Sequence, residues 1–174
     1  VTYVTDKIRE NQTVPEDELD ATARCIAIAA LKYGDLSNLA TKDYIFDLER
    51  FAAFEGNTGP YAQYTYARTR SILRRADEAP QKAVHITASE EGELAKVLSR
   101  FPERVNGAIA EYEPSVITRY ILDVCAAFNR FYHECPILSA DGETRATRLN
   151  LVRATSQVLG NALDLICLKK PEQI

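Results

Sequence analysis

The sequence predicts an all-α fold, a helical bundle, on the strength of three observations. Apolar residues recur at helical spacing over long segments, and no alternating strand pattern of any length competes with them. Prolines and glycines fall where these segments begin and end, as is typical of helix boundaries. With 174 residues and 46% hydrophobic content, the chain can bury one core of ordinary size. The composition therefore favours one folded unit with an appendage and disfavours disorder.

The first predicted helix follows Pro15 and ends near Gly34. Its first turn is acidic, which suits the exposed N–H groups at a helix start. Its apolar positions are Leu19, Ala23, Ile26, Ala27, Ala30 and Leu31. An extended stretch over 42–46 comes next. Asp47 then provides a good N-cap for a brief helix that reaches Phe54 and ends at Gly56.

The next helix runs from Pro60 to about Arg75, and 77–80 breaks it. Pro60 suits the first helical position. Thr87 and Glu90 are expected to form a capping-box pair ahead of a helix containing Leu94, Val97 and Leu98. Pro102 opens a further helix that carries, on one face, Val105, Ala108, Ile109 and Tyr112.

Pro114 starts the predicted longest helix, which Pro136 closes. Its inward positions are Val116, Ile117, Tyr120, Ile121, Val124, Phe128 and Phe131. A last helix follows the turn at Asp141 and Gly142 and ends before Pro171. It is expected to bury Leu149, Val152, Val158, Leu159, Leu163 and Ile166.

Two basic segments stand out against a formal net charge of −4. Residues 61–75 contain no carboxylate but carry Arg68, Arg70, Arg74 and Arg75. Residues 144–163 carry Arg145, Arg148 and Arg153, which we also expect to be unopposed. For any single arginine, a solvated helix face or a buried pair with a carboxylate is the more common role. Arginines without intrahelical partners leave a positive field for an anionic partner such as nucleic acid.

Three tyrosines add a second signal for nucleic acid. Tyr61 and Tyr64 lie three residues apart and share a helix face, while Tyr132 lies off the apolar stripe near a helix end. Exposed aromatic rings stack on unpaired bases. Each tyrosine also has an alternative interpretation. Tyr61 or Tyr64 could be a core residue, and Tyr132 could be an ordinary surface residue. Gly56 and Gly59 before a helix also resemble an anion-binding helix start, or simply a turn.

Catalysis by this chain alone is disfavoured. Its two histidines, His85 and His133, lack metal-ligand spacing, and no nucleophile elbow or phosphate-binding loop is present. The four cysteines show no C-x-x-C spacing, so reduced thiols in a cytosolic protein are expected. Neither a signal peptide nor an apolar run of membrane-spanning length occurs, which predicts no membrane partner. The absence of methionine suggests a piece of a longer polypeptide.

Taken together, several segments resemble arginyl-tRNA synthetases, in order and at the family's spacing. The resemblance covers essentially the whole chain, and its most specific part is 54–68. The other matching segments are 30–38, 42–47, 128–132, Arg148 with Leu149, 163–165, and Pro171 with Glu172.

This resemblance implies a class I ligase that activates arginine with ATP and Mg²⁺ and esterifies it to its tRNA. The family's two ATP-handling signatures, of the H-x-G-H and K-M-S-K types, do not occur here, so this chain would hold no cofactor and no catalytic residue itself. Residues 1–55 would be the tail of the catalytic half, with a helix that supports the tRNA stem. Residues 56–174 would be the anticodon-binding bundle. The implied partners are tRNA(Arg), chiefly its anticodon loop, and the upstream catalytic domain.

The resemblance also implies roles for individual residues. The loop Gly56, Asn57, Thr58, Gly59, Pro60 and Tyr61 would approach the anticodon loop. Tyr132 would lie against an anticodon base, with the terminal Ile174 nearby. Gln63, Arg68 and Arg148 match motif positions, either for RNA contact or for bracing the bundle. Cys167 departs from the family, which usually has glycine there, and the ending of the chain departs as well.

Two alternatives to an RNA-binding module remain at this point. One is a stand-alone helical protein-interaction module whose tyrosine and arginine face receives an acidic partner. The other is a self-contained helical enzyme with a buried carboxylate site, which the absence of a Glu-x-x-His pair disfavours.

Overall fold

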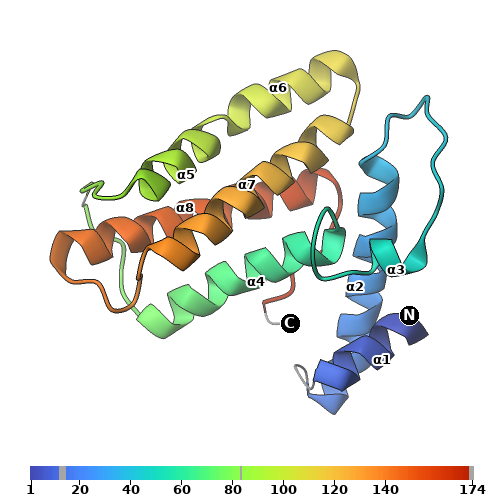
Figure 1. Ribbon diagram of the computed structural model, residues 1–174, viewed down its shortest axis with the longest axis horizontal. Coiled ribbons are helices and arrows are strands. Elements are labelled where there is room, and N and C mark those ends of the chain that lie inside the picture. Colours follow the sequence, from blue (N-terminus) through green and yellow to red (C-terminus); the bar gives the residue numbers. More distant parts are fainter. Residues whose placement is uncertain (12–14, 83, 173–174) are drawn as a thin grey trace.

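The computed structural model describes residues 1–11, 15–82 and 84–172, and these ranges form eight α-helices without a strand (Figure 1). The all-α prediction is therefore confirmed. The helices are α1 (Thr2–Asn11), α2 (Glu16–Leu36), α3 (Leu48–Phe51), α4 (Gly59–Ala76), α5 (Ser89–Ser99), α6 (Phe101–Glu111), α7 (Ser115–Glu134) and α8 (Gly142–Leu165). None of these helices is long and apolar enough to cross a membrane.

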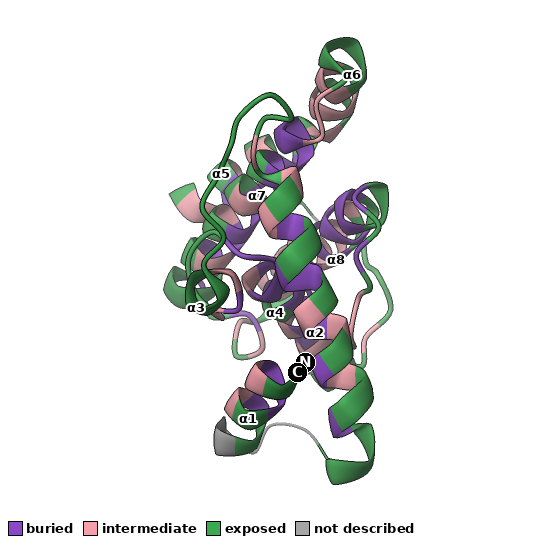
Figure 2. Cartoon of the chain, turned by 90° about the vertical axis from the view of Figure 1, so that its right-hand side faces the viewer, coloured by how far each residue is buried: buried purple, intermediate pink, exposed green. Residues whose placement is uncertain are grey.

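Helices α4, α7 and α8 lie side by side, and α5 and α6 follow one another along α7 (Figure 1). The buried residues gather where these helices pack against one another, whereas α6 is coloured as exposed or intermediate (Figure 2). The main core includes Leu94, Ile121, Val124, Phe128, Phe131, Leu149, Leu159 and Leu163. All predicted inward positions of α7 are buried, which confirms the strongest periodic segment of the sequence.

A smaller core joins α1 to α2 and contains Val4, Ile8, Leu19, Ala23, Ile26, Ala30 and Ala52. Another face of α2 belongs to the main core. Its Tyr33 is fully buried, and the Tyr33 hydroxyl donates a hydrogen bond of 2.7 Å to the Thr118 carbonyl of α7. Helix α2 is therefore shared between the two cores.

The α4 start lies close against α2. A Cβ atom at Gly59 would come within 2.4 Å of the Ala29 carbonyl oxygen, so only glycine fits there without a shift of backbone. Gly34 has a similar constraint, because a Cβ would lie 2.3 Å from the Phe51 ring. We expected Gly34 to end its helix, but α2 continues to Leu36, and this glycine provides room for a neighbouring ring.

The structure before α4 differs from the sequence prediction in two further respects: α3 ends earlier than expected, and α1 was not expected. Asp47 does cap α3, because its side chain accepts a hydrogen bond from the Arg50 amide. The helix nevertheless ends at Phe51, short of the predicted Phe54. The Thr58 hydroxyl donates to the Ala53 carbonyl at 2.6 Å, which turns the chain toward α4. Helix α1 was not predicted; it has ten residues and buries Val4 and Ile8, with Tyr3 partly buried beside them.

The capping pair at α5 was predicted one residue too early. The carboxylate that caps this helix belongs to Glu91 and not to Glu90. It accepts from the Thr87 amide at 2.6 Å and from the Ala88 amide at 3.1 Å. Glu91 faces the interior and is fully buried, which determines this register.

Helix lengths and one predicted face also need correction. Helix α8 has 24 residues and is longer than α7 with 20. Ile109 and Tyr112 were expected on the packed face of α6, yet they are 66% and 92% exposed. Helix α6 lies at the edge of the bundle and packs mainly against α7. Tyr112 ends it in the left-handed conformation, with φ of 53°, which directs the residue away from the helix face.

Candidate nucleic-acid interface

Side chains from α4 and α7 meet in one cluster of aromatic and polar groups. Tyr61, Tyr64 and Arg68 follow one another at spacings of three and four on α4, so they share a face. Asn129 and Tyr132 lie three residues apart on α7, which packs against α4. We call these five residues the Tyr–Arg cluster.

The Arg68 guanidinium lies over two tyrosine rings from different helices. Its central carbon is 4.7 Å from the Tyr64 ring centroid and 5.0 Å from the Tyr132 ring centroid. Both distances are within the roughly 6 Å over which a cation is attracted to a ring face. Tyr64 and Tyr132 are each 38% exposed, so the cluster opens to solvent.

Asn129 connects the arginine to the third tyrosine. Arg68 Nη1 donates to Asn129 Oδ1 at 2.7 Å, and Asn129 Nδ2 donates to the Tyr61 hydroxyl at 2.7 Å. Because an arginine only donates, these two bonds fix which way the amide points. No described carboxylate pairs with Arg68, whose positive charge therefore stays uncompensated.

The loop before α4 divides into an exposed part and a buried part. Gly56, with a left-handed φ of 73°, and Asn57 are exposed. Thr58 is buried and caps α4, since its hydroxyl accepts from the Tyr61 amide at 3.1 Å. Gly59 and Pro60 are buried as well. Of this predicted RNA-contact loop, Gly56 and Asn57 face solvent, while the following residues hold the α4 start against α2.

Arg148 lies at another site and has a partner of opposite charge. Its Nε donates to Glu91 Oε1 at 2.6 Å, and its Nη1 donates to the Pro136 carbonyl at 2.7 Å. These contacts join α8 to the start of α5 and the chain after α7. Burial by itself raises the pKa of the Glu91 carboxyl. Hydrogen bonds from Arg148, Thr87 and Ala88 outweigh burial and leave this pKa below its ordinary value.

The second basic segment is not unopposed, contrary to the sequence prediction. Arg145 pairs with Glu78 at 2.6 Å, and Arg153 donates to the Glu78 backbone carbonyl. Together with Arg148, these arginines bind the segment that connects α4 to α5. Their carboxylate partners and the Glu78 carbonyl lie 57 to 75 residues away in sequence, so helical spacing could not reveal these contacts.

The first basic segment is also partly paired. Arg70 and Arg74 contact the Glu172 carboxylate at 2.9 and 3.2 Å, and all three side chains are substantially exposed. The end of the described chain therefore lies along α4. The predicted contact at Ile174 falls outside the described residues.

Asn129, a member of the cluster, and Gln63 on α4 have roles that sequence spacing only partly indicated. Asn129 was not singled out, although its position three residues before Tyr132 places both on one face. Gln63 is fully buried, and its Nε2 donates to the Lys169 carbonyl at 2.8 Å. Gln63 therefore braces the chain after α8 against α4. His133 is exposed, as expected for a surface residue.

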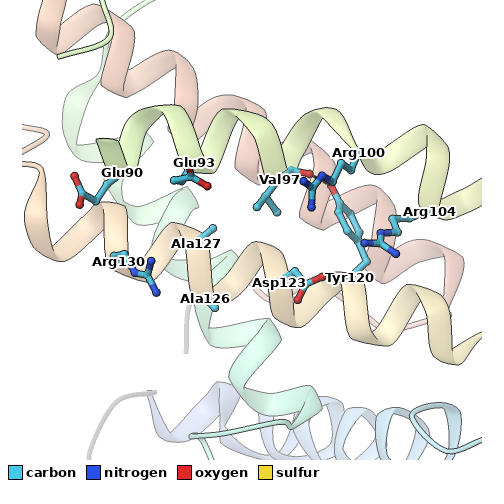
Figure 3. A pocket seen from close by; sticks show the side chains of 10 residues that line it. All are labelled: Glu90, Glu93, Val97, Arg100, Arg104, Tyr120, Asp123, Ala126, Ala127 and Arg130. Carbon is cyan, nitrogen blue, oxygen red and sulfur yellow. Dashed lines mark hydrogen bonds between the residues drawn. The ribbon is translucent and has the colours of Figure 1, made fainter. Parts of the chain in front are cut away.

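A separate hollow of 310 Å³ lies between α7 and the pair α5 and α6 (Figure 3). Its charged side chains are of both signs: Arg100, Arg104, Arg130, Glu90, Glu93 and Asp123. Such mixed charge creates no single-sign field for a ligand. Among the described residues, no group of three or more potential ligand side chains could hold a metal ion.

Comparison with known proteins adds independent findings. Residues 62–174 match the family described as the DALR anticodon binding domain. The arginine–tRNA ligase of Alkaliphilus oremlandii is 43% identical over an alignment of 176 positions, which covers 98% of this chain and 30% of that protein. The corresponding ligase of Enterobacter sp. is 41% identical over 170 residues, with 95% of this chain and 30% of that protein covered. This chain thus spans about a third of these relatives' length.

Solved structures with the same fold include two arginyl-tRNA synthetases. The Thermus thermophilus enzyme superposes with a TM-score of 0.93 at 31% identity, over 99% of this chain and 30% of that one. The Plasmodium falciparum enzyme gives a TM-score of 0.89 at 24% identity, over 99% of this chain and 32% of that one.

Proposed function

The chain belongs to the DALR anticodon-binding domain family, and from that premise we propose that it is the anticodon-binding portion of an arginine–tRNA ligase. The observation that carries the proposal is the Tyr–Arg cluster. Two partly exposed tyrosines from separate helices surround an arginine whose charge has no carboxylate partner among the described residues. Aromatic rings and an uncompensated cation suit the bases and phosphates of an unpaired RNA loop.

In this proposal the partner is tRNA(Arg), held chiefly by its anticodon loop. Tyr132 stacks on a base, and Gly56 with Asn57 approaches the loop from the α4 start. Tyr64 and Arg68 complete the contact, while Thr58, Gly59, Pro60 and Tyr61 maintain its geometry. Arg148 contributes indirectly, because it holds the helices in register through Glu91.

The role of this portion in catalysis is positioning. Binding the anticodon loop orients the distant acceptor end, so that transfer of arginine becomes effectively intramolecular. ATP and Mg²⁺ would be bound by an upstream catalytic domain of the same polypeptide, in the cytoplasm where protein synthesis takes place. We assign residues 1–55 to the tail of that catalytic half and residues 56–174 to the anticodon-binding bundle.

Replacing Tyr132 tests the base contact. We expect Tyr132→Ala to weaken binding to an arginine-accepting tRNA by about 1–3 kcal/mol, the magnitude of one lost base stack. Fluorescence titration with the purified chain measures the change. Tyr112→Ala is the matched control, because Tyr112 is an exposed tyrosine at the end of α6 and outside the cluster. Equal affinities for the wild type and Tyr132→Ala would remove Tyr132 from the site.

Salt dependence tests the phosphate contacts. Affinity should fall steeply as salt is added, because bound phosphates release counterions. Arg68→Ala should reduce the slope of log affinity against log salt concentration by about 1, the amount expected for one lost phosphate contact. Arg153→Ala should leave this slope unchanged, since Arg153 is bound to the Glu78 carbonyl. A flat salt dependence would contradict an RNA ligand. Gel shift with tRNA, set against pull-down of acidic proteins, separates this proposal from a protein-interaction module.

A further inference from the structure

Arg68 covers the ring faces that RNA would need. Its guanidinium is planar and lies over both Tyr64 and Tyr132, with ring centroids at 4.7 and 5.0 Å. A nucleobase that stacks on either ring requires the same kind of position, over the ring face. In the free chain, the arginine therefore occupies the place at which a base would bind.

The contacts that hold Arg68 are weak compared with those of other arginines in the chain. It donates to the neutral amide of Asn129 and contacts two exposed rings. Arg145 and Arg148 instead bind carboxylates. When Arg68 moves away, no buried charged group loses its partner, because the hydrogen-bond partner Asn129 is neutral and only partly buried.

The surroundings of Arg68 are held independently of it. Tyr132 stacks on Phe128, which is fully buried in the main core. Asn129 keeps its Nδ2 on the Tyr61 hydroxyl, so its Oδ1 remains directed at the position of the Arg68 donor. Removal of the guanidinium would thus leave two ring faces and one hydrogen-bond acceptor in place.

We propose that Arg68 is a placeholder, which a base of single-stranded RNA displaces from Tyr64 and Tyr132 on binding. The incoming base stacks on the tyrosines and donates an N–H group to Asn129 Oδ1, as Arg68 Nη1 does in the free chain. The displaced guanidinium, on its long side chain, stays near the RNA and binds a phosphate. This inference rests on the proposed function and adds the residue that controls access to the stacking site.

The test separates the contribution of the base from that of the charge. Affinities are measured for an anticodon stem-loop of an arginine-accepting tRNA, and for versions in which each loop base in turn is removed to leave an abasic sugar. For the base that enters the cluster, the ratio of the abasic to the intact dissociation constant reports its stacking. We expect Arg68→Ala to raise this ratio by about threefold to tenfold. In this variant the base no longer has to displace a guanidinium from the tyrosine rings, and the factor corresponds to the energy of one or two exposed cation–π contacts.

Two further variants separate the guanidinium of Arg68 from positive charge in general and from a loss of folding. Arg70→Ala removes a charge two residues away, from a side chain paired with Glu172, and should leave the ratio unchanged. Arg68→Met keeps a long side chain without the guanidinium, and should raise the ratio in the same direction even if Arg68→Ala folds poorly.

The outcomes distinguish this inference from the proposed function. A ratio that is unchanged in both Arg68 variants, or raised equally by Arg70→Ala, would overturn the placeholder role while RNA binding stands. If the wild-type chain bound neither the intact nor any abasic stem-loop, the proposed function would fail, and the inference with it.

Discussion

Arg68 on α4 and Arg148 on α8 are both partly buried, and each contacts another helix, but their partners differ in kind. Arg148 bonds the fully buried carboxylate of Glu91 at 2.6 Å. Arg68 bonds the neutral amide of Asn129 and lies over two partly exposed tyrosines. One arginine is therefore committed to the fold, and the other keeps its charge for a ligand. Burial alone does not distinguish them; the charge of the partner does.

This comparison predicts that the same substitution will have unequal effects at the two positions. Arg148→Ala would leave the Glu91 carboxylate buried without its counter-charge, and should cost about 3–5 kcal/mol in the free energy of unfolding. Urea denaturation followed by circular dichroism measures it. The variant Glu91→Gln with Arg148→Met removes both charges and should recover much of the loss. An exposed ion pair typically contributes less than about 1 kcal/mol. A loss of that size for Arg148→Ala would contradict the structural role of Arg148.

Acid should also reduce the contribution of the Arg148–Glu91 ion pair to the free energy of unfolding, by less than Arg148→Ala does. The net pKa of Glu91 is lower in the folded chain than its ordinary value of 4.5, because burial is outweighed by the hydrogen bonds from Arg148, Thr87 and Ala88. Its contribution to stability is therefore complete above pH 4.5 and is lost as pH falls toward the folded-state pKa. Denaturation midpoints measured from neutral pH down to acid pH should fall less steeply in Glu91→Gln. Parallel profiles would show that Glu91 does not contribute.

Arg68→Ala should cost only about 1 kcal/mol in the free energy of unfolding, since it removes exposed cation–π contacts and one hydrogen bond to a neutral group. The same denaturation assay measures it, side by side with Arg148→Ala. A cost that equals that of Arg148→Ala would erase the contrast between the two arginines.

The smallest effect is expected at Glu172. Its carboxylate pairs with Arg70 and Arg74 in an exposed setting, so Glu172→Gln should change the free energy of unfolding by less than about 1 kcal/mol. Addition of salt to the wild type should reduce this difference further. A salt-independent loss larger than that of Arg68→Ala would place Glu172 with Glu91 as a structural carboxylate.

Much of the fold could be predicted where burial repeats with the helical period. The buried stripe of α7 could be predicted directly from the sequence, because the inward positions from Val116 to Phe131 that define it are mostly large and apolar. Helix α1 has ten residues, and it buries only Val4 and Ile8, with Tyr3 partly buried, so its apolar face is short. The face of α6 was predicted only in part: Val105 and Ala108 pack against the main core, but Ile109 and Tyr112 are exposed. Periodicity indicates an amphipathic helix but not how much of its apolar face a neighbour covers.

The site was harder to predict, because its distinguishing contacts join residues far apart in the chain. Unopposed arginines on α4 and α8 look equivalent in sequence. The pairing of Arg148 with Glu91 spans 57 residues, and that of Arg68 with Asn129 spans 61. Tyr64 and Tyr132 were both predicted as stacking residues. The sequence did not predict that the Arg68 guanidinium lies over both rings, because this arrangement depends on the packing of α4 on α7. Their contact with RNA remains a prediction.

Helix α2 has a consequence for how the chain melts and how it can be shortened. It supplies Ile26 to the small core and Tyr33 to the large one, so neither core can come apart without disturbing the helix they share. Heat or denaturant should then unfold both in a single cooperative transition. A truncated chain that began at residue 56 would lose the Tyr33 ring and its bond to Thr118, leaving a hole beside α7 and the Gly59 backbone open to water.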